Sequence, residues 1–168
     1  MTVLDALESK VFPSILWKDN PSDLSQWLSK LPRPLVFTNG CFDILHRGHV
    51  TYLAQAAALG KSLLVGVNDD ASVRAQDKGS DRPLNTLDDR MAVLASLQVV
   101  NGVVPFSQTT PLELIEIVRP EVLVKGGDWT VDKIVGGTEV TGWGGTVHSI
   151  PFKFTRSTSG LIDKIRAE

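Results

Sequence analysis

The chain has 168 residues, of which 42% are hydrophobic and 21% charged, and its formal net charge at pH 7 is −2. This length fits one domain that buries roughly 70% of its unfolded surface, and the charge offers no basic field for nucleic acid. The single cysteine, Cys41, excludes an intramolecular disulfide and suits a reducing cytosol. No apolar run approaches bilayer-spanning length, and the N-terminus lacks the pattern of a signal peptide. We therefore expect a cytoplasmic protein without a nucleic-acid or membrane partner.

Residues 1–33 stand apart as an N-terminal helical extension, and we expect residues 34–168 to form the main domain. Prolines punctuate this first stretch. Short helices are predicted over residues 5–11 and 22–30, the second capped by Ser22 or Asp23. Trp17 and Trp27 are expected to pack the extension onto the main body or onto a second subunit.

From Leu35 onward, short apolar strands alternate with helical segments. Strands are predicted over residues 35–38, 62–68, 102–106, 121–125 and 146–150. Helices are predicted over about residues 50–59, 87–97, 110–119, 130–140 and 158–167, with a long polar loop over 69–85. Thr86, Thr110 and Ser157 are the expected caps. Such alternation indicates a Rossmann-like, doubly wound α/β fold: a five-stranded parallel sheet of order 3-2-1-4-5 with helices on both faces. Ligands bind such sheets at the carboxyl ends of the strands.

The most informative segment runs from Thr38 to His49 and reads TNGCFDILHRGH. A strand, a tight turn and a helix start are compressed here, so backbone N–H groups and the helix dipole converge on one point and favour an anion. His46 and His49, with Gly48 between them, add two imidazoles that can hold polyphosphate and its developing charge. The alternative is a packed histidine pair at a helix N-terminus. Asn39-Gly40 before the pair favours the phosphate site.

Basic residues are concentrated at loop positions. Any one of these loop cations could be simply a solvated charge, but Lys78-Gly and Arg82-Pro together are more typical of a mobile lid that closes on phosphate. Arg90 falls in the first turn of a helix, where a cation is disfavoured, which indicates an anionic partner, either a ligand or nearby carboxylates. Arg156 precedes the predicted helix cap at residues 157–159, which forms a second candidate anion site.

Two acidic residues are candidates for ligand binding. Asp43 lies between the strand and the histidines, and because a buried, unpaired carboxylate is costly, we expect it to accept bonds from substrate hydroxyls or turn N–H groups. Asp128 follows Gly126-Gly127 and is placed to accept from a ribose hydroxyl, with the glycines allowing close approach of a flat base. Trp129 and Trp143 are candidates for stacking on a ligand, although packing is the default for each.

Several nucleotide-binding and hydrolytic motifs are missing from the sequence. The strand predicted over residues 35–38 is not followed by Gly-x-Gly-x-x-Gly, and neither a P-loop nor a Gly-x-Ser-x-Gly elbow occurs. These absences argue against a dinucleotide Rossmann site, a P-loop enzyme and an α/β hydrolase. One cysteine and scattered histidines also argue against structural zinc.

The histidine signature and the helix cap at 157–159 together resemble the nucleotidyltransferase superfamily, which is related to class I aminoacyl-tRNA synthetases. More narrowly, the chain resembles the D-glycero-β-D-manno-heptose 1-phosphate adenylyltransferases through segments 37–46, 65–72, 82–85, 89–91, 110–113 and 122–128. The resemblance covers roughly residues 35–165. That family makes ADP-heptose for the lipopolysaccharide inner core, in many bacteria fused behind a ribokinase-type sugar kinase. No kinase fits here, so we expect a separate heptose 7-phosphate kinase to supply the substrate.

The resemblance implies in-line attack by the sugar 1-phosphate on the α-phosphorus of ATP, with release of pyrophosphate. Its implied catalytic residues are His46, His49, Lys78 and Arg90. Nucleotide and phosphate binding are implied for Thr38, Asn39, Gly40, Cys41, Phe42, Gly48, Gly126, Gly127, Asp128, Arg156, Ser157, Thr158 and Ser159. Acceptor binding is implied for Asp43, Lys125 and Arg82. Mg²⁺ is expected to arrive with ATP, held mainly by its phosphates rather than by a protein metal site. We also expect a homo-oligomer.

Two other functions remain open at this point. One is a transferase of the same fold that uses glycerol 3-phosphate, phosphopantetheine or nicotinate mononucleotide, because pocket contacts decide the acceptor. The other is a non-catalytic nucleotide-binding module, against which the intact pair His46 and His49 weighs. A synthetase fragment is disfavoured because no room remains for a tRNA-binding domain.

Overall fold

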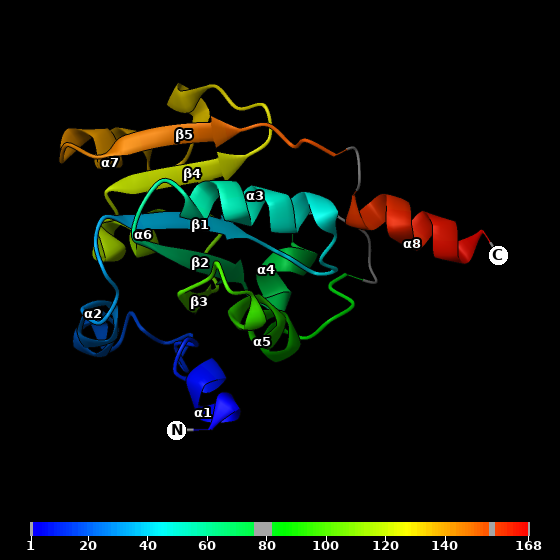
Figure 1. Cartoon of the computed structure of the whole chain (residues 1–168), viewed down its shortest axis with the longest axis horizontal. Coiled ribbons are helices and arrows are strands. Elements are labelled where there is room, and N and C mark those ends of the chain that lie inside the picture. Colours follow the sequence, from blue (N-terminus) through cyan, green and yellow to red (C-terminus); the bar gives the residue numbers. More distant parts are fainter. Residues whose placement is uncertain (1, 76–81, 155–156, 168) are drawn as a thin grey trace.

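The computed structural model describes residues 2–75, 82–154 and 157–167. Its centre is a five-stranded sheet of order β3-β2-β1-β4-β5 in which all neighbouring strands run parallel (Figure 1). The strands are β1 (Leu35–Gly40), β2 (Ser62–Asn68), β3 (Gly102–Phe106), β4 (Val122–Gly126) and β5 (Thr146–Ile150). The predicted Rossmann-like fold and strand order are confirmed. Strands β2, β3 and β5 have the predicted bounds, and in β2 and β3 these bounds follow from apolar runs flanked by polar or glycine residues.

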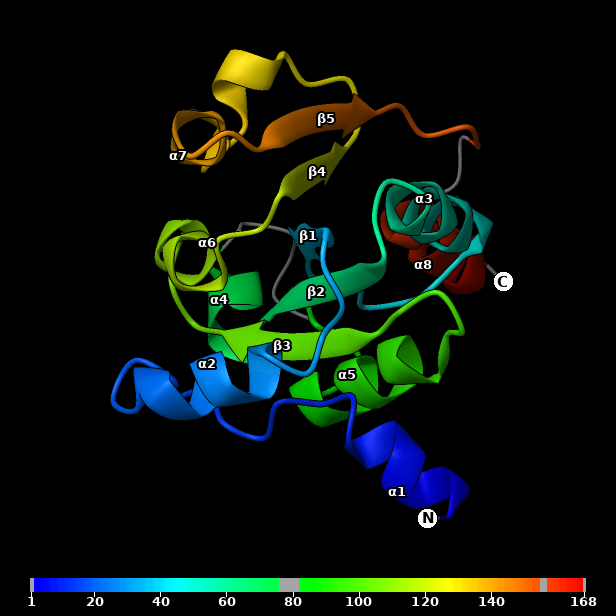
Figure 2. The same ribbon diagram turned by 60° about the vertical axis from the view of Figure 1, so that its left-hand side comes forward.

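Helices cover both faces of the sheet, as predicted (Figure 2). One hydrophobic cluster joins Phe37 and Leu64 to residues of α2 (Pro21–Leu28), α6 (Leu112–Val118) and α7 (Gly137–Gly142). A second cluster joins Val36 and Val65 to α3 (Arg47–Ala57) and α5 (Leu87–Ser96). The shorter elements are α1 (Val3–Glu8), α4 (Asp70–Arg74) and the 3₁₀ helix η1 (Val131–Lys133). Helix α8 (Thr158–Arg166) lies beyond the carboxyl ends of the strands (Figure 1).

Most departures from the predicted elements occur at helix starts. Helix α3 begins at Arg47 rather than after His49, because His46 takes the cap position and accepts the N–H of Gly48. Helix α6 begins at Leu112 behind Pro111, and no side-chain cap forms there, so the predicted capping box at Thr110 is wrong. Caps depend on the local backbone path, which a sequence pattern alone does not fix.

Other boundaries also moved. The predicted loop over 69–85 contains α4, which is capped by the Asp69 side chain. The predicted helix over 130–140 is split into η1 and α7, which are separated by Gly136 at φ 84°. Helix α1 starts earlier than predicted because Thr2 and Asp5 form a capping box. The predicted caps Thr86 and Ser157 are confirmed.

The N-terminal extension contributes to the core of the sheet. Val11 forms a parallel bridge with Val103 on the edge strand β3. Trp17 is 1% exposed and donates its indole N–H to the carbonyl of Pro105 at 2.8 Å. Leu24 and Leu28 of α2 belong to the same cluster. Residues 11–28 therefore cover the edge strand and pack onto the main body, the first of the two predicted alternatives.

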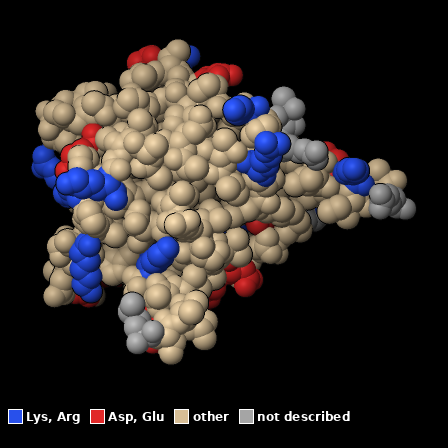
Figure 3. Space-filling view, viewed as in Figure 1, with Lys and Arg blue, Asp and Glu red and all other residues tan. Residues whose placement is uncertain are grey.

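The surface is of mixed charge. On the face shown in Figure 3, Lys and Arg side chains form separate patches among acidic and uncharged residues. Among the described helices, none has both the length and the apolar character required to cross a membrane.

Candidate active site

Two adjoining cavities open where β1 and β4 end. The larger, of about 270 Å³, extends towards the start of α6 and towards η1. The smaller, of about 140 Å³, lies beside α3 and includes His49 and Tyr52 in its wall. Both cavities share the lining residues Asn39, Gly40, Cys41 and Lys125. The end of the central strand thus separates two spaces at the position where this fold binds ligands.

The turn after β1 stacks the two histidines against each other. Phe42 adopts a left-handed backbone conformation with φ 49°, which turns the chain sharply out of the strand. The rings of His46 and His49 then stack with their centroids 3.9 Å apart and an interplanar angle of 23°. The backbone N–H of Gly48 donates to Nδ1 of His46 at 3.1 Å. A Cβ atom at Gly48 would lie 2.9 Å from Cε1 of His46, so a side chain there would require the imidazole to shift.

His49 is held in the neutral form. Burial, together with the smaller effect of the charge on nearby His46, lowers its pKa to about 4, and the Ile44 carbonyl opposes both effects. Its Nδ1 atom is buried and has no hydrogen-bond partner among the described residues. At neutral pH, His49 therefore offers a neutral ring with unused hydrogen-bonding capacity beside the smaller cavity.

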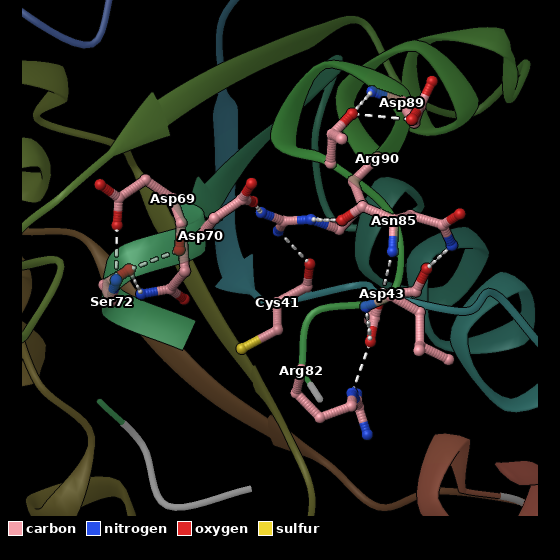
Figure 4. A network of polar contacts seen from close by, with 12 residues as sticks. Cys41, Asp43, Asp69, Asp70, Ser72, Arg82, Asn85, Asp89 and Arg90 are labelled. Atoms are coloured by element: carbon pink, nitrogen blue, oxygen red, sulfur yellow. Dashed lines mark hydrogen bonds and ion pairs between the residues drawn. The ribbon is translucent and has the colours of Figure 1, made fainter. Parts of the chain in front are cut away.

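Asp43 lines neither cavity, and its polar contacts bind the turn to the segment before α5 (Figure 4). Its carboxylate accepts the Nε–H of Arg82 at 2.5 Å and the backbone N–H groups of Leu84 and Asn85 at 2.9 Å each. Burial alone would raise the pKa of Asp43, but the N–H groups of Asn85 and Leu84 and the Arg82 guanidinium hold it below its usual value. Asp43 thus accepts backbone N–H groups, but they belong to the segment before α5 and not to its own turn. Asp43 and Arg82, both expected to face the acceptor, bind each other.

Arg90 holds the same turn from another side (Figure 4). It is 1% exposed and donates to the carbonyl of Cys41 at 2.6 Å, to the carboxylate of Asp70 at 2.7 Å and to the carbonyl of Asn85 at 3.2 Å. Its anionic partner is thus a nearby carboxylate, one of the two predicted alternatives. Arg90 lines neither cavity, so any effect of it on a ligand passes through the turn.

The other wall of the smaller cavity comes from β4 and the segment after β5. Tyr52 donates to the carbonyl of Val124 at 3.3 Å and shares a 2.5 Å hydrogen bond with the hydroxyl of Thr38, so the predicted phosphate ligand Thr38 is buried with its hydroxyl engaged. Burial raises the pKa of Tyr52 to about 12, against the opposing hydrogen bonds. A Cβ at Gly126 would lie 2.8 Å from Phe152, which explains the glycine there.

The start of α8 contacts the histidine turn directly. The Ser157 side chain caps the helix by accepting from the N–H of Gly160 at 3.0 Å. The Thr158 hydroxyl donates to the carbonyl of Ile44 at 3.2 Å, while Ser159 is exposed. The structure thus brings the predicted second anion site next to the first. Lys78 and Arg156 lie outside the described residues.

Several lining residues escaped sequence reasoning. Asn68, Lys133 and Phe152 line the cavities together with the predicted Gly40, Gly126 and Lys125, whereas Gly48 and Gly127 line neither. Asn68 ends β2 at the ligand-binding edge of the sheet, a signal that could have identified it. The positions of Lys133 and Phe152 depend on how the chain returns after β4 and β5, which no local pattern reveals. Within the described ranges, no group of three or more acidic, histidine or cysteine residues could hold a metal ion.

Comparison with known proteins places the chain in a family. The family model described as cytidylyltransferase-like matches residues 37–161. The D-beta-D-heptose 1-phosphate adenylyltransferase of Bordetella bronchiseptica is 58% identical over 137 residues, which cover 82% of this chain and 85% of that protein. The bifunctional protein HldE of Pseudomonas paraeruginosa is 56% identical over 132 residues, 79% of this chain. The chain spans about 28% of the length of that bifunctional relative.

Two solved structures share the fold. The lipopolysaccharide core biosynthesis protein from Thermoplasma volcanium has a TM-score of 0.58 and 26% identity over 73% of this chain and 98% of its own. The pantoate-beta-alanine ligase from Francisella tularensis, with a TM-score of 0.60 and 17% identity, covers 83% of this chain with 67% of its own and shows the fold alone. On these findings, the chain belongs to the cytidylyltransferase-like family of nucleotidyltransferases, together with the heptose 1-phosphate adenylyltransferase of Bordetella bronchiseptica.

Proposed function

We propose that the chain transfers the adenylyl group of ATP to D-glycero-β-D-manno-heptose 1-phosphate, giving ADP-heptose and pyrophosphate for the lipopolysaccharide inner core. The observation that carries this proposal is the 58% identity to an adenylyltransferase of that name, which extends over 85% of that relative. The stacked pair His46 and His49, of which His49 lines the smaller cavity, supports a phosphoryl-transfer site.

The reaction is a single displacement at the α-phosphorus. An oxygen of the sugar 1-phosphate forms a bond to the α-phosphorus, and the bond from that phosphorus to the oxygen bridging to the β-phosphate breaks. Pyrophosphate leaves with the electron pair. The nucleophile is already an anion at neutral pH, so no general base is needed, and positioning and charge stabilisation supply the rate.

The two adjoining cavities suit two substrates that react at one atom, the α-phosphorus of ATP. We assign ATP to the smaller cavity beside His49 and the acceptor to the larger one, with Lys125 in the wall of both. An acceptor phosphate near Lys125 would then face the α-phosphorus across the end of β1. The backbone of residues 38–42 and the N-terminus of α8 are assigned to the polyphosphate.

The histidines stabilise the charge that develops on the α-phosphoryl oxygens. His49, neutral at pH 7, donates one N–H to such an oxygen without carrying a positive charge into the ground state. Nδ1 of His46 accepts the Gly48 N–H, so the neutral ring carries its proton on Nε2 and donates from there. Asp43, Arg82 and Arg90 act as positioning residues through the turn, and Lys78 and Arg156 remain predicted polyphosphate ligands.

Mg²⁺ is proposed to enter with the substrate, as MgATP. Among the described residues no three-ligand cluster is available for a metal, so the triphosphate oxygens would hold the ion. Chelation by EDTA should abolish turnover, and excess Mg²⁺ should restore it. A cytoplasmic location, a homo-oligomer and a separate kinase that supplies the sugar phosphate remain part of the proposal.

A pyrophosphate-release assay tests the function. ATP and CTP are each crossed with heptose 1-phosphate, glycerol 3-phosphate and phosphopantetheine. We expect turnover with ATP and heptose 1-phosphate, and a preference over CTP of about a hundredfold, because each unpaired polar group on a mismatched base costs about 1–3 kcal/mol. Comparable rates with CTP, or activity with glycerol 3-phosphate alone, would overturn the substrate assignment. No turnover with any pair would favour a binding module.

A further inference from the structure

One tryptophan presents its ring in the wall of the larger cavity. Trp129 is 49% exposed, whereas Trp17 is 1% exposed. Trp129 lines the larger cavity but not the smaller one that contains His49. An exposed indole costs free energy unless something covers it, and a ligand cavity is where such a ring is useful.

The Trp129 indole is fixed in place before any ligand arrives. Its backbone N–H donates to the hydroxyl of Ser149 at 3.1 Å, and that hydroxyl donates to the carbonyl of Gly127 at 2.6 Å. The indole N–H donates to the carbonyl of Gly126 at 3.2 Å. Because its one donor is used, the ring has only apolar contact to offer a ligand.

The glycine pair makes room for this arrangement. Gly127 has φ 111°, in the left-handed region that favours glycine. A Cβ atom there would lie 3.1 Å from the indole nitrogen of Trp129 and 3.3 Å from its Cδ1. The segment after β4 is therefore built to hold the ring against the backbone, which keeps the loss of side-chain entropy on binding small.

The rest of the cavity supplies polar and positively charged groups. Lys125 and Lys133 bring two cations, and amide and hydroxyl side chains come from the ends of β1 and β2 and from the start of α6: Asn39, Asn68, Thr109 and Thr110. Cations bind phosphate, amides and hydroxyls bind sugar hydroxyls, and an aromatic face covers the apolar C–H face of a sugar ring. A phosphorylated sugar offers all three kinds of group to such a wall.

We propose that Trp129 is the platform for the sugar ring of the acceptor and thereby a determinant of acceptor specificity. The proposal rests on the proposed function and goes beyond it by assigning the residue that recognises the sugar. A flat nucleobase is the competing ligand for an aromatic ring. The observations favour the sugar, because Trp129 lies outside the cavity of His49, where Phe152 is the exposed aromatic wall instead.

Steady-state kinetics on the full chain separate the two substrates. For Trp129→Ala we expect the KM for heptose 1-phosphate to rise about tenfold or more, since aromatic contacts and buried area together reach this size. The KM for ATP should stay within about twofold, and Trp129→Phe should recover most of the loss. Trp143→Phe is the matched control, because Trp143 lines neither cavity, packs against the hydrophobic cluster that contains α6 and α7, and donates to the carbonyl of Pro120.

Tryptophan fluorescence tests the same contact without turnover. Titration with heptose 1-phosphate should change the emission of the wild type and of Trp143→Phe, but not that of Trp129→Phe. The proposal is overturned if Trp129→Ala raises the KM for ATP instead, if neither KM changes, or if Trp129→Phe keeps the full fluorescence response. Failure of the proposed function looks different: the wild type itself would show no turnover with ATP and heptose 1-phosphate.

Discussion

His49 is the side chain whose chemistry depends most on its surroundings. Its folded-state pKa of about 4 lies below the ordinary value of 6.5, so between these values the unfolded chain binds more protons than the folded one. The stability linked to His49 is therefore fully present above about pH 6.5 and is lost as the pH falls towards 4. As the pH falls from 6.5 to 4, we expect the free energy of unfolding of His49→Asn to decrease less than that of the wild type.

Urea unfolding at several pH values between 4 and 7 measures this difference. His148→Asn is the control, since the His148 ring lies in β5 and shares a 3.1 Å hydrogen bond with the hydroxyl of Thr146. It should keep the wild-type pH dependence. Equal pH dependence in His49→Asn and in the wild type would mean that the His49 ring is not held neutral in the folded protein.

The sequence predicted the histidine pair but not its surroundings. His46, Gly48 and His49 were identifiable because four adjacent residues carry the motif, and the glycine requirement is local. The roles of Asp43 and Arg82 were not, because their pairing spans 39 positions along the chain and depends on where the segment after α4 returns. The charges of Asp43 and Arg82 correctly indicated that each side chain has a charged or polar partner. Only the fold shows that the two side chains are partners of each other.

The turn between β1 and α3 is held in place by contacts with a distant segment of the chain. Asp43 makes the central contacts, with Arg82 and with the backbone N–H groups of Leu84 and Asn85, and we call this set of contacts the clamp. Asp43→Asn leaves Arg82 without its anion and turns one acceptor oxygen into a donor that faces backbone N–H groups. Breaking a buried ion pair costs about 3–5 kcal/mol, and we expect a loss of stability of roughly this size in urea unfolding.

The exposed pair Lys18 and Glu113 offers a matched comparison. Lys18→Gln should change stability by less than about 1 kcal/mol, because exposed ion pairs contribute little. An Asp43→Asn variant as stable as the wild type would show that the clamp does not hold the turn. The elements themselves followed the sequence where apolar runs defined them, as in β2 and β3, and departed from it where caps did, as in α3 and α6.

Across the whole molecule, the N-terminal extension is part of the hydrophobic core. Trp17 is fully buried against the edge strand, and removing a buried tryptophan side chain costs about 3–5 kcal/mol. Trp17→Ala should therefore unfold at a clearly lower urea concentration. Its neighbour Leu16 is 63% exposed, and Leu16→Ala should stay within about 0.5 kcal/mol of the wild type. A Trp17→Ala variant with unchanged stability would contradict a shared core.

The parallel α/β architecture could be predicted from sequence because apolar strands alternate with helices along the chain, whereas the cavities could not. Trp129 and Lys133 reach the larger cavity only through the path of the chain after β4, where the sequence predicted one helix and the structure has η1 and α7. Sequence patterns of this kind report local periodicity, and a pocket wall is assembled from residues far apart in the chain.

We propose that the stacked pair His46 and His49 catalyses adenylyl transfer to a sugar 1-phosphate. The most direct test is the kcat for ADP-heptose formation by folded His49→Ala beside the wild type, with product followed by ³¹P NMR. Loss of one preorganised donor to a transition-state oxyanion costs about 10²–10³ in kcat. We predict a loss of that size, with wild-type ADP-heptose and pyrophosphate appearing in equal amounts. Near-normal turnover by folded His49→Ala would contradict a catalytic role for the histidine pair.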